Sequence, residues 1–135
     1  VNATYYSALG ESDEKMLLAR AIQMFMPGKP QIWYLDLFAG KNDHEAVQRA
    51  GESGHKEINR TNLSVDQIAE GLKKDVVQKQ LALIRMRNTH KAFSEGAEVT
   101  ISGEESSLEI RWEYDGAYAE LHVNFEEGTY TIESN

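Results

Sequence analysis

The sequence predicts an α/β part followed by an all-β part, and three observations lead to this prediction. Before residue 95 the apolar residues recur with helical spacing, whereas after it they alternate with polar residues as in strands. The short apolar run at residues 31–35 lies between helical segments, which is typical of a buried strand in an α/β fold. Asp115-Gly116 separates two alternating runs and favours a tight hairpin turn.

The first helix is predicted over residues 12–26. Ser12 can cap its start, two acids follow in the first turn where the helix dipole favours them, and Pro27-Gly28 ends it. Residues 31–35 come next and are predicted as a strand buried on both faces, because the run is rich in β-formers and too short for a helix.

A long polar segment, residues 36–63, follows this strand, with one or two helical turns predicted at 44–50. A connection of this length inside a compact domain is usually functional, and α/β barrels build their active sites beyond the C-terminal ends of their strands. Helices are predicted over residues 64–91, because Ser64 and Gln67 match a capping box and Asp75 can cap a second helix.

From residue 99 the alternation predicts a β-meander. Folding the chain at Asp115-Gly116 brings apolar residues together on one face and an ion pair on the other, so both faces agree on one register. The predicted pairs are Leu108 with Val123, Ile110 with Leu121, Trp112 with Ala119, and Arg111 with Glu120. A further hairpin at Glu127-Gly128 is predicted to pair Phe125 with Tyr130 and Val123 with Ile132, and another is predicted around Gly103.

Composition excludes several classes of function. The 135 residues include 14 Lys and Arg against 22 Asp and Glu, a net charge of -8, which argues against nucleic-acid and membrane partners. Cysteine is absent, which excludes disulfide scaffolds, thiol catalysis and cysteine-bound zinc. The sequence begins at Val1 without a signal peptide, and we therefore expect a piece of a larger cytoplasmic protein.

The histidines give little indication of a metal site. His44-Glu45 begins like a zinc-protease motif, but Gln48 stands where its second histidine is required. His122 is predicted to make an ordinary cross-strand contact with Glu109. The polar residues 54–60 leave two interpretations open: a sugar-binding loop, or a solvated loop with internal Lys/Arg–Glu pairs.

Six short stretches resemble the C-terminal part of sucrose phosphorylase and its relatives in the α-amylase superfamily. In order they are Asn2-Ala3-Thr4-Tyr5-Tyr6-Ser7-Ala8-Leu9-Gly10, Ala19-Arg20-Ala21-Ile22-Gln23, Pro27-Gly28-Lys29-Pro30-Gln31, Ala39-Gly40-Lys41-Asn42-Asp43, Glu57-Ile58-Asn59-Arg60 and Arg87-Asn88-Thr89-His90. The closest branch suggested by the departures from the sucrose pattern is glucosylglycerate phosphorylase, with sucrose 6-phosphate enzymes beside it. Those departures are Trp33, Asp36-Leu37-Phe38 and Gly54-His55-Lys56-Glu57.

The resemblance implies the C-terminal part of a (β/α)8 barrel in residues 1–92 and the start of an antiparallel β domain in residues 93–135. It implies a retaining transfer of glucosyl from glucosylglycerate or a sucrose-type donor to inorganic phosphate, giving α-glucose 1-phosphate. It also implies no metal or organic cofactor, and a nucleophile and an acid/base that lie upstream of Val1. On this basis the chain by itself is predicted to be inactive.

Two residues are predicted to bind substrate. Lys56 aligns with a family arginine that holds the glucosyl group, and Glu57 aligns with a family aspartate beside it. The alternatives are an α-glucoside hydrolase of the same barrel family, or a non-catalytic packing fragment. For the isolated chain we expect contact with the rest of the barrel, or self-association through unpaired strand edges.

Overall fold

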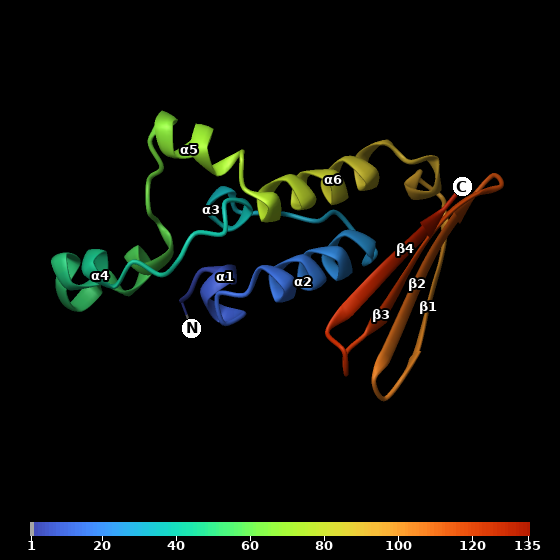
Figure 1. The fold of residues 1–135 in the computed structure, drawn as a ribbon, viewed down its shortest axis with the longest axis horizontal. Helices are drawn as coiled ribbons and strands as arrows, with labels where there is room; N and C mark the ends of the chain where they lie inside the picture. The colour runs from blue at the N-terminus through green and yellow to red at the C-terminus, as the bar shows by residue number, and fades with distance from the viewer. Residues whose placement is uncertain (1) are drawn as a thin grey trace. The chain divides into compact units, whose positions relative to one another are not determined.

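The computed structural model describes residues 2–135, and it contains helices followed by one antiparallel sheet (Figure 1). These residues form two compact units. The first contains the residues up to Met16 together with Gln31–Lys79, and the second contains Leu17–Pro30 together with Gln80–Asn135. The units therefore divide the chain differently from the boundary predicted at residues 92 and 93, because residues 17–30 and 80–92 belong with the sheet.

The first unit consists of short helices joined by extended segments. Helix α1 spans Tyr5–Ala8, α3 spans Tyr34–Leu37, α4 spans His44–Ala50, the 3-10 helix η1 spans Gly51–Asn59, and α5 spans Val65–Gly71. The helical turns predicted at 44–50 are confirmed, but the segment 36–63 contains more helix than the sequence predicted. The capping box is confirmed, since Gln67 N donates to Ser64 Oγ and Ser64 N donates to Gln67 Oε1.

Two longer helices contribute to both units. Helix α2 spans Asp13–Phe25 and confirms the helix predicted over residues 12–26, with Lys15 N donating to Ser12 Oγ at its start. Helix α6 spans Asp75–Thr89 and agrees with the second of the helices predicted within residues 64–91.

Residues 31–35 do not form the predicted strand within residues 2–135. Trp33 is extended, with φ -72° and ψ 134°, but the chain then turns into α3. All strand pairings among residues 2–135 lie within the C-terminal sheet, so the run at 31–35 has no ladder to join. An apolar run with β-forming residues supplies a strand only where a neighbouring strand completes its hydrogen bonds.

The second unit contains the sheet, with β1 at Glu98–Glu104, β2 at Ser107–Tyr114, β3 at Ala117–Asn124 and β4 at Thr129–Ser134. The four strands follow one another in chain order and are all antiparallel (Figure 1). The β2–β3 register is the predicted one in every pair, including Arg111 opposite Glu120. Asp115 and Gly116 both have positive φ, 47° and 79°, as a two-residue hairpin turn requires.

The predicted register of the last hairpin is wrong by two residues. Tyr130 faces Val123, not Phe125, and Ile132 faces Leu121. Pairing stops at Asn124 because Phe125 N instead donates to Ser106 O at 2.9 Å, and Asn124 Oδ1 accepts from Glu127 N at 3.0 Å. The resulting loop is longer than a two-residue turn, but a shift of two residues leaves each side chain on its predicted face.

The sheet and the helical residues of the second unit share an aromatic core. Trp112 Nε1 donates to the carbonyl of Phe25 at 2.6 Å. The ring of Phe93 lies between them, with its centroid 5.3 Å from that of Phe25 and 5.2 Å from that of Trp112. This core explains why residues 17–30 belong with the strands.

Candidate functional site

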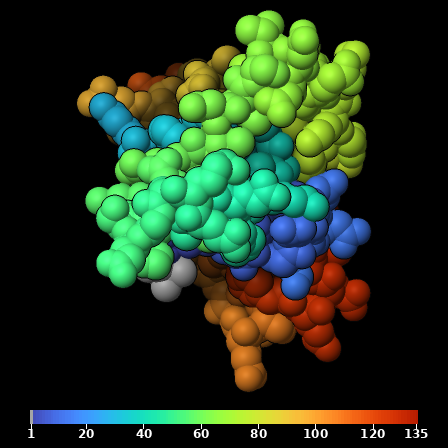
Figure 2. Space-filling view, turned by 90° about the vertical axis from the view of Figure 1, so that its left-hand side faces the viewer, coloured from blue at the N-terminus to red at the C-terminus, as the bar shows by residue number. Residues whose placement is uncertain are grey.

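The first unit contains an open hollow of about 420 Å³ whose walls are part polar and part apolar. Its lining residues come from three separate stretches of sequence and are Asn2, Trp33, Asp36, Lys56, Asn59 and Arg60. The segment from α4 to η1, coloured teal to green in Figure 2, lies at the front of the surface in that view. A concave surface that combines an aromatic ring with charged and amide groups is the usual form of a small-ligand site.

Side chains of residues 36–59 fix the N-terminal segment that borders the hollow. Asp36 Oδ1 accepts from the backbone N–H of Tyr5 at 2.8 Å, and Asn42 Oδ1 accepts from that of Thr4 at 2.7 Å. Asn59 Nδ2 donates to the carbonyl of Ala3 at 3.2 Å. Two of these three residues, Asp36 and Asn59, also line the hollow, so its wall is tied to the backbone beside it.

The Gly40–Asp43 stretch has a structural role. A Cβ at Gly40 would lie 2.5 Å from two side-chain carbons of Leu35, so only glycine fits there. Asn42 N donates to Ser7 Oγ at 3.0 Å, and Asp43 caps α4 by accepting from Ala46 N at 2.9 Å. Asp43 N also donates to the carbonyl of Ile58 at 2.8 Å, which joins the start of the segment to its end.

The two residues predicted to bind substrate lie in different surroundings. Lys56 is exposed and lines the hollow, and within residues 2–135 its ammonium makes no ion pair. Glu57 is half-buried, and its carboxylate lies 3.6 Å from Arg60, at the i,i+3 spacing. The structure therefore joins Glu57 to Arg60, as the interpretation with internal Lys/Arg–Glu pairs expects, and it places Lys56 and Arg60 at the hollow.

The hollow gathers positive charge on an acidic chain. Lys56 and Arg60 both line it, whereas the chain as a whole carries a net charge of -8. Asp36 is the one acidic group among the lining residues that the structure describes, and it already accepts a backbone N–H. The local site is thus suited to an uncharged or anionic ligand in spite of the charge of the chain.

A second hollow of about 390 Å³ lies in the same unit, and several of its polar groups are paired with neighbours. Tyr6 donates its hydroxyl to Asp13 Oδ1 at 2.8 Å, and this hydrogen bond to the carboxylate raises the pKa of Tyr6. Lys41 Nζ lies 3.1 Å from a carboxylate oxygen of Glu11. The first hollow is the better candidate because it contains Lys56, one of the two residues predicted to bind substrate.

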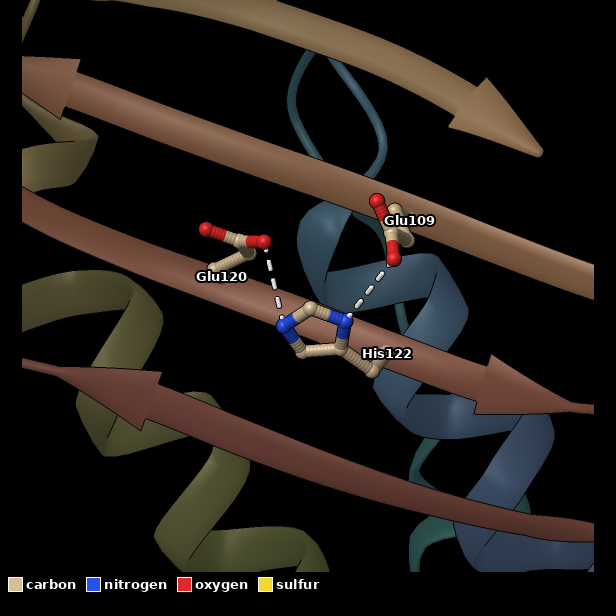
Figure 3. A group of neighbouring side chains, drawn as sticks. All are labelled: Glu109, Glu120 and His122. Carbon is tan, nitrogen blue, oxygen red and sulfur yellow. Dashed lines mark hydrogen bonds and ion pairs between the residues drawn. The ribbon is translucent and has the colours of Figure 1, made fainter.

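A histidine on the outer face of the sheet lies between two carboxylates (Figure 3). His122 Nδ1 is 3.2 Å from Glu109 Oε1, and its Nε2 is 3.0 Å from Glu120 Oε1. Each ring nitrogen therefore contacts a different carboxylate. One donor atom from each of Glu109, Glu120 and His122 lies within 4.8 Å of the other two, and these groups are already paired with one another or with Arg111. Glu120 also accepts from Arg111 at 2.7 Å, a bond that raises the pKa of Arg111. The predicted cross-strand contact of His122 with Glu109 is confirmed.

Sequence reasoning did not select Trp33, Asp36 or Asn2 as site residues. It included Asn59 and Arg60 only as members of the polar stretch 54–60, for which a sugar-binding loop was one of two interpretations. Trp33 was assigned to a strand interior, where its exposure could not be expected. Three of the departures from the sucrose phosphorylase pattern, Trp33, Asp36 and Lys56, nevertheless line the same hollow. The departure of these three positions from the pattern is the signal in the sequence that could have indicated the site.

Comparison with known proteins agrees with the resemblance. A sucrose 6(F)-phosphate phosphorylase from Ilumatobacter coccineus is 52% identical over 132 residues, which are 98% of this chain and 25% of that protein. Glucosylglycerate phosphorylase from Escherichia coli is 28% identical, over 80% of this chain and 21% of that protein. No family model matches the chain.

The fold is also found in a solved structure. The crystal structure of sucrose 6F-phosphate phosphorylase from Thermoanaerobacter thermosaccharolyticum superimposes with a TM-score of 0.91 at 42% identity, covering 98% of this chain and 26% of that one. The chain thus spans about a quarter of the length of the curated relatives it matches. It is homologous to that part of the sucrose phosphorylase-like glucoside phosphorylases, as the quoted stretches predicted.

Proposed function

We propose that the protein containing this chain is a retaining α-glucoside phosphorylase that transfers a glucosyl group from a phosphorylated, sucrose-type donor to inorganic phosphate. The product is α-glucose 1-phosphate. The observation that carries the proposal is the 52% identity to a sucrose 6(F)-phosphate phosphorylase over nearly the whole chain, combined with a cationic hollow in that homologous region.

The comparisons change the order of the expected donors. The sequence departures favoured glucosylglycerate first, but the glucosylglycerate enzyme shares 28% identity with this chain, against 52% for the sucrose 6(F)-phosphate enzyme. Lys56 and Arg60 suit a donor with a phosphate group, since ammonium and guanidinium groups both bind phosphate oxygens well. In this arrangement Lys56 binds the phosphate of the fructosyl unit, in place of the glucosyl contact that the resemblance implied for it. The relatives' names do not favour the hydrolase or the packing-fragment alternatives.

Within this proposal the chain binds and orients substrate and does not perform the bond-breaking step. Lys56 contacts the substrate in the hollow, and Glu57 holds Arg60 at its rim through their ion pair. The nucleophile and the acid/base lie outside these 135 residues, in the remainder of a (β/α)8 barrel.

A phosphorylated donor does not cross a bilayer unaided, because burying its charge is costly, so a cytoplasmic location belongs to the same proposal. No helix among residues 2–135 is long and apolar enough to span a membrane.

The reaction is tested on the full-length protein with sucrose 6(F)-phosphate, in the presence and absence of inorganic phosphate. We expect phosphate-dependent release of glucose 1-phosphate, and none from the purified 135-residue chain. Release of free glucose at the same rate without phosphate would overturn the proposal in favour of hydrolysis. Activity of the isolated chain would show that the nucleophile and the acid/base lie within these 135 residues, contrary to the proposal.

The role of Lys56 is tested with Lys56→Ala in the full-length protein. Loss of a hydrogen-bond donor to the bound substrate should lower kcat/KM by roughly ten- to a hundredfold. Lys15→Ala is the matched control, because Lys15 is also exposed, lies on α2 and is not among the residues that line the hollow. Full activity of the Lys56 variant would remove Lys56 from the site.

A further inference from the structure

Trp33 is a large apolar side chain that the fold leaves half uncovered. Its side chain is 51% exposed, and it lines the cationic hollow together with polar residues. Single exposed apolar residues are common, but an exposed indole set among amide, carboxylate and cationic groups in a concave surface is typical of a ligand contact.

The indole ring is held in place without a ligand. Its Nε1 donates to the carbonyl of Asn59 at 3.2 Å. Its ring meets that of Tyr34 edge-on, with centroids 5.0 Å apart and planes 63° apart. Tyr34 is fixed in turn, because its hydroxyl donates to the carbonyl of Thr61 at 2.6 Å. The polar edge of the indole is therefore occupied, and what the ring offers to the hollow is its apolar surface.

The chemistry around the ring selects the class of ligand. An aromatic face attracts cations, but Lys56 and Arg60 line the same hollow and repel them. The same two groups attract an anion. A ligand that satisfies both ring and cations needs one flat apolar surface and one anionic group, with hydroxyls for Asp36 and Asn59. A sugar phosphate has all three, since the C–H groups of a sugar ring form a flat apolar face.

We propose that Trp33 is a substrate-binding residue whose indole ring packs against the sugar ring of a phosphorylated saccharide in the hollow. The inference rests on the proposed function and adds the contact that distinguishes this site from a purely electrostatic phosphate site. Trp33 thereby contributes to selection of the sugar, and Lys56 and Arg60 contribute to retention of its charged group.

The direct test uses full-length protein labelled with fluorotryptophan and followed by fluorine NMR. The Trp33 resonance is identified as the signal that Trp33→Phe removes. Titration with fructose 6-phosphate should shift this resonance, whereas inorganic phosphate alone or fructose alone should shift it much less at equal concentration. A resonance that stays in place would overturn the proposal. An equal shift with phosphate alone would overturn it as well.

Kinetics supply the second test. Trp33→Ala should raise KM for sucrose 6(F)-phosphate by roughly two- to tenfold with little change in kcat, and Trp33→Phe should restore most of the loss because it keeps an aromatic face. Phe125→Ala is the matched control, since Phe125 is 50% exposed and lies in the second unit. An unchanged KM in a phosphorolytically active Trp33→Ala protein would refute the role of Trp33 and leave the proposed function intact. A wild-type protein without phosphorolysis would refute the proposed function itself.

Discussion

The β2–β3 pair and the polar segment 36–63 are held in place by different forces. In the strand pair, Ile110, Ala119 and Leu121 are fully buried, so apolar area removed from water fixes the structure. Within residues 36–63, by contrast, Gly54 alone is buried, and the segment is fixed by hydrogen bonds from single side chains to distant backbone groups.

The difference determines how each region tolerates change. Hydrophobic burial is non-directional and is shared among many neighbours, so similar apolar residues can replace one another at moderate cost. A side-chain bond to one backbone group depends on one atom in one place, so any substitution that lacks this atom removes the bond entirely. A site on the polar segment can therefore change its specificity through few residues, while the sheet stays the same.

The largest effect is expected in the sheet. Ile110 and Ile101 are directly opposite each other on β2 and β1, but Ile110 is fully buried and Ile101 is 47% exposed. Ile110→Ala should lower the free energy of unfolding by about 2–5 kcal/mol, and Ile101→Ala by about 1 kcal/mol. Urea unfolding of both variants measures the difference. Equal losses would mean that burial does not govern this pair, and Ile110→Val provides the same comparison if Ile110→Ala does not fold.

The next effect is expected in the polar segment. Asn42→Ala removes the acceptor for the backbone N–H of Thr4, a residue that is 1% exposed, and should cost about 1–3 kcal/mol. Asn42→Asp is the control, because it keeps an oxygen at the acceptor position. Amide hydrogen exchange at Thr4 should accelerate in the alanine variant alone. Unchanged exchange in that variant would show that the segment is held by other contacts.

Arg87 combines both kinds of force in the second unit. Its guanidinium donates to the carbonyls of Met24, Met26 and Gly28 at 2.5, 3.0 and 2.6 Å, and it lies 4.3 Å from the ring of Trp112. Burial of this group lowers the pKa of Arg87, which remains charged at neutral pH.

Arg87→Lys keeps the charge but loses the planar fork, so we expect a loss of about 1–2 kcal/mol in unfolding free energy. Arg85→Lys, at an exposed position on the same helix, is the control and should be neutral. Thermal unfolding measures both. If the two variants lost the same stability, the hydrogen bonds of Arg87 to the three carbonyls would not contribute measurably to the free energy of unfolding.

The same contrast explains how much of the fold could be predicted. The β2–β3 register followed from local alternation and one turn, since a slip by one residue would expose Ile110 and Leu121. The capping box at Ser64 was predictable because its two partners are three residues apart. The last hairpin was misjudged because its loop depends on Ser106, which is distant in sequence from Phe125.

The candidate site was only partly predictable for a related reason. Lys56 was selected through the resemblance, and the structure places it in the hollow. Trp33 was not selected, because the apolar run around it predicts a strand whatever its neighbours are. Its exposure depends on Asn59 and Tyr34, and the bond to Asn59 joins residues 26 positions apart, which no local pattern encodes.

The smallest effect is expected from the ion pair between Lys91 and Asp115, which joins η2 (Lys91–Phe93) to the hairpin turn. The two groups lie 2.8 Å apart and are exposed, and their hydrogen bond lowers the pKa of Asp115 and raises the pKa of Lys91.

The lowered pKa of Asp115 adds stability at pH values above the pKa of the unfolded chain, about 4, and that stability disappears as the pH falls through the lowered folded pKa. The raised pKa of Lys91 adds stability at pH values below its pKa in the unfolded chain, about 10. That stability disappears as the pH rises through the raised folded pKa. Asp115→Asn removes the charge and keeps a residue suited to the turn before Gly116, so its stability deficit should be small near pH 7, should shrink as the pH falls below about 4 and should shrink in high salt. A deficit that persisted unchanged at low pH and in high salt would assign the effect to the turn and not to the ion pair.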